Sequence, residues 1–148
     1  MLGEPNRFGR QPRPELLRSL ARHLAMRVAD DEFDQGEWCR TARCALGHAT
    51  SVPAIRAEGL RVRNASGRST LVLRSQDMRR ISDIAGRSLE AVTGHGFLLA
   101  EFLFGITQVE AEDVFDWEAG RNESRSAVAA RLRQLAAKYD GKRLDIDV

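Results

Sequence analysis

Two cysteines and a histidine that could do chemistry together occur in the segment 39–48. Cys44 precedes His48 by four positions, a spacing that places two side chains on the same face of a helix. Thr41 is a suitable N-cap for such a helix, and the positive end of the helix dipole would favour the thiolate form of Cys44. The pair could therefore serve as a Cys-His nucleophile.

The same residues have two other interpretations. Cys39, Cys44, His48 and the distant His95 supply four side chains of the types that bind zinc, although the four-residue gap between the cysteines is wider than the usual spacing of two. Free cysteine is also among the most buried residue types, and the neighbouring small residues favour a packed helix crossing. The sequence identifies no partner for His23 or His95. We expect structural cysteines, and we predict no catalytic residue, bound metal or cofactor.

Charge is distributed unevenly along the chain, and this predicts a binding surface. The segment 56–80 has a net charge of +5, and the segment 101–118 has a net charge of −6. Without an aromatic residue among them, the arginines of segment 56–80 do not predict base stacking. We expect a non-enzymatic protein that binds another macromolecule through opposed basic and acidic faces, a protein partner being favoured over nucleic acid. The predicted binding residues are Arg56, Arg61, Arg63, Arg68, Arg74, Arg79 and Arg80.

Motifs that carry a known catalytic mechanism are absent from the sequence. It contains no glycine-rich phosphate loop, no Gly-x-Ser-x-Gly, no His-Glu-x-x-His and no paired-carboxylate signature. This absence weakens each enzyme hypothesis.

The elements that must position these residues are mostly helical. Apolar residues recur at steps of three and four, which predicts a mainly α fold of five or six helices around Trp38, the Cys44 helix and segment 97–104. Segments 60–63 and 70–73 flank a turn and predict one small β-hairpin. The helical patterns occupy residues 14–30, 39–49, 51–58, 75–86, 97–104, 107–115 and 124–139.

At 148 residues, 43% of them hydrophobic, the chain is the size of one domain. We expect residues 1–13 to form a flexible or loosely docked basic arm and residues 14–141 to form a single helical domain. We expect residues 142–148 to form a C-terminal tail. Apolar runs are too short for a membrane span, and no secretory signal is recognisable. With two cysteines only, we expect a cytoplasmic protein.

The cysteine segment resembles a group of uncharacterised small bacterial and phage-encoded proteins. They share a Trp, then Cys-Gly-Thr-x-Ala-Cys-x-x-Gly-His-Ala, then a short helix that begins with proline. The resemblance covers about 100 residues, from Phe33 to Leu135, and departs from the pattern at Arg40 and Arg43. It implies a shared fold and a phage or mobile-element association, but no established activity. The matching residues are Trp38, Cys39, Thr41, Cys44 to Ala49, Val52 to Arg56 and Gly59-Leu60.

A second resemblance is to ADP-ribosyltransferases. The run from His48 to Ser51, followed by Gly59-Leu60, is similar to the His-x-Thr-Ser segment that meets NAD in that family. The resemblance implies that His48 contacts the nicotinamide ribose and that Glu101 is a catalytic carboxylate. However, the helical periodicity of segment 97–104 argues against the strand-rich sheet of that fold.

Overall fold

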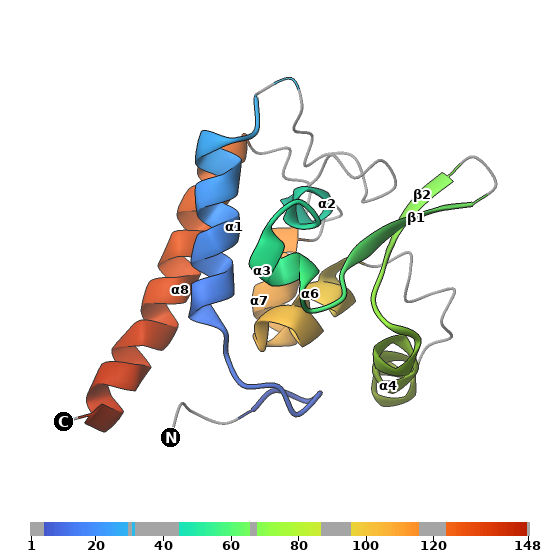
Figure 1. Ribbon diagram of the computed structural model, residues 1–148. Coiled ribbons are helices and arrows are strands. Elements are labelled where there is room, and N and C mark those ends of the chain that lie inside the picture. The colour runs from blue at the N-terminus through green and yellow to red at the C-terminus, as the bar shows by residue number, and fades with distance from the viewer. Residues whose placement is uncertain are drawn as a thin grey trace.

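The computed structural model describes residues 5–29, 31, 45–65, 68–86, 96–115 and 124–147 (Figure 1). These residues form seven helices and one two-stranded antiparallel sheet. The predicted mainly α fold with a small hairpin is confirmed. The described ranges contain seven helices where five or six were expected, and each overlaps a segment with a helical apolar pattern. Of the helices in these ranges, none has the length and apolar character required to cross a membrane.

Helices α1 (Pro14–Met26) and α8 (Arg125–Asp147) pack side by side and run antiparallel (Figure 1). Pro14 lies at the first helical position, where its missing N–H costs nothing. The buried residues of the two helices recur at steps of three and four, so one face of each helix enters the core. They are Leu16, Leu17, Leu20, Ala21 and Leu24 on α1, and Val128, Ala129, Leu132, Ala136 and Tyr139 on α8.

The predicted end of the last helix at residue 139, just before Gly141, is wrong. Helix α8 continues to Asp147 and includes most of the segment expected to be a tail. Glycine costs only about 1 kcal/mol in a helix interior, so a single glycine does not oblige a helix to end.

Helix α6 (Gly96–Phe104) lies at the centre of the core, and α7 (Gln108–Phe115) follows it. Residues 98–106 are all buried, including the charged Glu101. Gly105 ends α6 with a positive φ of 65°, which allows the chain to turn into α7. The rings of Phe104 and Phe115 then stack with centroids 5.6 Å apart. The prediction of a buried helix over 97–104 is thus confirmed.

Helices α2 (Ala45–Ala49) and α3 (Pro53–Arg56) are short and lead into the hairpin of β1 (Arg61–Ala65) and β2 (Arg68–Val72). The register pairs Val62 with Leu71, whose side chain is buried, so this pair faces the core. Neighbouring strand residues face the opposite side, which directs Arg61 and Arg63 outward. Helix α4 (Ser75–Ala85) follows the hairpin.

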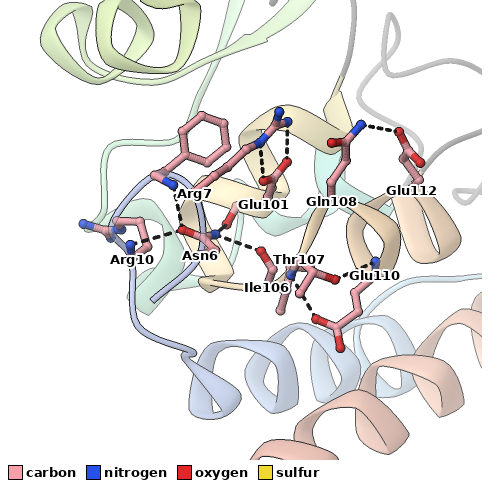
Figure 2. Close-up of polar contacts among 10 residues, drawn as sticks. Asn6, Arg7, Arg10, Glu101, Ile106, Thr107, Gln108, Glu110 and Glu112 are labelled. Atoms are coloured by element: carbon pink, nitrogen blue, oxygen red, sulfur yellow. Dashed lines mark hydrogen bonds and ion pairs between the residues drawn. The ribbon is translucent and has the colours of Figure 1, made fainter. Parts of the chain in front are cut away.

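Residues 5–13, part of the arm expected to be flexible or loosely docked, pack against α6. The side chain of Phe8 has no exposed surface, and its ring meets that of Phe102 edge to face. Asn6 donates hydrogen bonds from its side-chain amide to the backbone oxygens of Glu101 and Ile106, both at 2.8 Å (Figure 2). One aromatic ring and one amide therefore anchor a segment whose composition resembles that of a loop.

Candidate functional site

Two of the predicted binding arginines are held at the end of α3. Arg61 Nη1 donates to the backbone oxygens of Arg56 and Leu60, each at 2.9 Å, and Arg74 Nη2 donates to the oxygen of Ala57 at 3.0 Å. The carbonyls of Arg56 and Ala57 lie at the end of α3, where they have no partner within the helix, so they can accept guanidinium N–H groups. Within the described part of the chain, neither arginine forms an ion pair with a carboxylate. Their positive charges are oriented but not neutralised.

The nearest carboxylate in the sequence, Glu58, is paired elsewhere. Its Oε1 accepts a hydrogen bond from Arg13 Nη1 at 2.8 Å, and Arg10 Nη2 lies 3.9 Å from Oε2. The segment 5–13 therefore neutralises an acidic residue that would otherwise offset the arginines of segment 56–80.

The remaining predicted arginines divide into two groups. Arg56 and Arg63 are exposed beside Arg61 and Arg74, and these four residues are called the arginine surface below. Arg79 and Arg80 belong to α4, where Arg80 Nη2 donates to the backbone oxygen of Phe8 at 2.8 Å and so holds α4 to segment 5–13. The side chain of Arg68 lies outside the described residues.

The predicted acidic face is largely occupied by contacts within the protein. Glu101 has 1% of its side chain exposed, and both of its carboxylate oxygens bind Arg7, at 2.7 Å to Nε and 2.8 Å to Nη2 (Figure 2). Asp113 forms an ion pair with Arg131 of α8 at 3.1 Å. The sequence pattern could not reveal this internal pairing, because the basic partners are distant in the chain. Asp116 and Glu118 lie outside the described residues.

Glu110 is the most strongly held of these acidic residues. Thr107 N–H donates to Glu110 Oε1 at 2.9 Å, and Glu110 N–H donates to Thr107 Oγ1 at 3.2 Å, so the two residues form a capping box at the start of α7 (Figure 2). Lys138 and the hydroxyl of Tyr139 also bind its carboxylate. Burial by itself would raise the pKa of Glu110, but these hydrogen bonds outweigh it and hold the pKa below its usual value. Glu110 therefore fastens α7 to α8.

Of the candidate catalytic and metal-binding residues, only His48 and Glu101 lie in the described part of the chain. Cys39, Cys44 and His95 lie outside the described residues, so their predicted contacts with His48 stay predictions. Within the described ranges, no three His, Cys, Asp or Glu side chains gather closely enough to hold a metal ion. Glu101, proposed as a carboxylate acting with NAD, is bound by Arg7 as described above.

His48 has a neighbour that sequence reasoning missed. Its ring on α2 lies 6.5 Å, centroid to centroid, from the ring of His23 on α1. Burial lowers the pKa of His23, and the positive charges of His48 and Arg27 lower it further. No local spacing could signal this contact, because His23 and His48 are brought together by the packing of α1 against α2.

Comparison of the chain with known proteins gave no match to a protein-family model, a curated protein or a solved structure.

Proposed function

We propose that the protein is a non-enzymatic binding protein whose arginine surface engages an acidic surface of another protein. The observation that carries the proposal is that main-chain carbonyls, rather than carboxylates, hold Arg61 and Arg74, at 2.9–3.0 Å. Such guanidinium groups keep a full positive charge for a partner.

The same contacts reduce the entropic cost of binding. A free arginine side chain loses about 2 kcal/mol of rotamer freedom when it is fixed. Arg61 and Arg74 are already fixed by the end of α3, so less of this freedom remains to be lost on association. Their remaining N–H groups can bind carboxylates, and charge-assisted hydrogen bonds of this kind are roughly twice as strong as neutral ones.

A protein partner is favoured over nucleic acid by composition. All seven basic residues between positions 56 and 80 are arginines, and arginine is enriched at protein interfaces whereas lysine is depleted. The segment offers no aromatic side chain for base stacking, and the whole chain has a net charge of only +2. The non-enzymatic interpretation is supported by Glu101, whose carboxylate already binds Arg7. The cytoplasmic location and the phage or mobile-element association stay predictions.

Charge reversal at the arginine surface tests the proposal. Arg56→Glu with Arg63→Glu changes two exposed side chains and spares Arg61 and Arg74, which hold the backbone of α3. A matched control makes the same charge change at Arg79 of α4 and Arg133 of α8, two exposed residues outside the arginine surface. Binding of a glutamate-rich peptide and of a short DNA duplex is measured at one ionic strength.

We expect the arginine-surface variant to bind the acidic peptide at least about tenfold more weakly than the control variant does. Equal affinities for the two variants would contradict the proposal. Tighter binding of the duplex, with an affinity that falls steeply as salt rises, would replace it with a nucleic-acid function.

A further inference from the structure

A groove of about 1010 Å³ lies between the second half of α1 and the start of α3. Its wall on the side of α1 includes Arg22, His23 and Met26, which share one helix face because they recur at steps of three and four, and Arg27, which directly follows the helix. Ser51 lies on the opposite wall. The volume is at the upper end of the range for small-molecule sites, roughly 300–1,000 Å³.

The charged part of the groove is uniformly positive. Arg22 and Arg27 are exposed, and no Asp or Glu is among the described residues that line the groove. The lowered pKa of His23 agrees with this geometry, since burial and then the positive charges of His48 and Arg27 disfavour its protonation. An anion in the groove would remove part of this repulsion.

An arginine of α8 compensates the negative end of the α1 helix dipole, which lies at the C-terminal end of α1. Arg125 Nη1 of α8 donates to the backbone oxygens of Leu24 and Ala25, at 3.0 and 2.9 Å. These carbonyls would otherwise repel an anion placed beside the end of the helix. Arg125 therefore leaves the positive side chains of α1 to determine the local field.

The rest of the groove is apolar. Met26 exposes 76% of its surface, far more than a core methionine, and Pro53 and Ala54 are exposed on the facing wall. Exposed apolar side chains beside converging polar groups are typical of a ligand site. A bound molecule would thus meet both cationic and apolar side chains in this groove.

We propose that this groove binds a small aryl phosphate, with the phosphate between Arg22, Arg27 and Ser51 and the ring against Met26 and Pro53. A phosphate monoester carries about −1.5 to −2 charges near neutral pH, so it suits two guanidinium groups better than a monoanion does. Arginine also matches phosphate geometry with paired N–H donors. The site is separate from the arginine surface, so it can be tested independently.

Phenyl phosphate is the probe, with benzyl alcohol as an uncharged aryl comparison. Titration calorimetry gives the affinity, and the ¹H–¹³C NMR signal of the Met26 methyl group reports where the ring lies. Arg22→Ala with Arg27→Ala removes both charges, and both side chains are exposed, so the fold is retained. Arg79→Ala with Arg133→Ala is the matched control, because it removes two exposed arginines elsewhere.

We expect phenyl phosphate to shift the Met26 signal and to bind the Arg22/Arg27 variant at least about tenfold more weakly, while the control binds as the wild type does. Benzyl alcohol should not bind measurably. The proposal is overturned if phenyl phosphate leaves the Met26 signal of the wild-type protein unchanged at millimolar concentration. It is also overturned if the Arg22/Arg27 variant and the control variant bind equally well.

Discussion

Replacing Arg7 by alanine will destabilise the protein more than any ordinary surface substitution. Glu101 is 1% exposed and gives both carboxylate oxygens to Arg7, whose side chain is 35% exposed. Removing one partner of a buried ion pair leaves an uncompensated charge and costs about 3–5 kcal/mol. Water can reach the Arg7 side of the pair, so we expect the lower end, about 3 kcal/mol.

Thermal and urea denaturation, followed by circular dichroism, measure this loss. For a chain of this length, about 3 kcal/mol lowers the thermal midpoint by roughly 6–12 °C. Arg133→Ala on the exposed face of α8 is the control, and its effect should stay within about 0.5 kcal/mol.

A second substitution distinguishes the buried charge from simple loss of packing. Glu101→Gln in the Arg7→Ala background removes the unpaired charge, so the double variant should regain at least about 1 kcal/mol relative to Arg7→Ala. A cost of less than about 1 kcal/mol for Arg7→Ala would refute the buried-charge explanation. A double variant less stable than Arg7→Ala alone would also refute it.

Three further predictions concern other parts of the fold. Gly105→Ala should lower the free energy of unfolding by about 2 kcal/mol more than Gly86→Ala does. Both glycines have a positive φ, but of the two only Gly105 has a backbone oxygen, that of Gln11, where a Cβ would lie 1.9 Å away. Equal losses of stability in urea denaturation would contradict the clash. His23 has a lowered pKa, so the unfolded state binds more protons below about pH 6.5 and stability falls as the pH falls. His23→Gln should flatten the decline from pH 7 to pH 5, and an unaltered slope in denaturation series would contradict this. Burial, followed by the hydrogen bond to Glu110 and its charge, raises the pKa of Tyr139, the single tyrosine of the chain. Tyrosinate absorbance should therefore appear well above pH 10, and an ordinary titration near pH 10 would be the contrary result.

Local patterns were sufficient to predict most elements of the described chain. Apolar spacing identified α1, α4, α6 and α7. The alternation of apolar and basic residues identified the hairpin, whose strands are β1 and β2. These signals succeed because helix and strand periods, caps and turns depend on residues within a few positions of each other.

The candidate sites were predicted less completely. Sequence reasoning selected the arginines of segment 56–80, but it could not separate Arg61 and Arg74, which hold the end of α3, from Arg80, which binds segment 5–13. Its expectation of an acidic face did not anticipate that Glu101 and Glu110 are used inside the fold. The groove beside His23 was not foreseen.

The sequence alone determined the helical class, the hairpin and the uneven distribution of charge, because each of these depends on composition or on neighbouring residues. Only the tertiary structure decided which charges are neutralised. Arg7 and Glu101 are 94 positions apart, and Glu110 and Tyr139 are 29 apart. Ion pairs and hydrogen bonds across such separations form only after the helices have packed, so the free positive charge at the end of α3 is a property of the folded molecule.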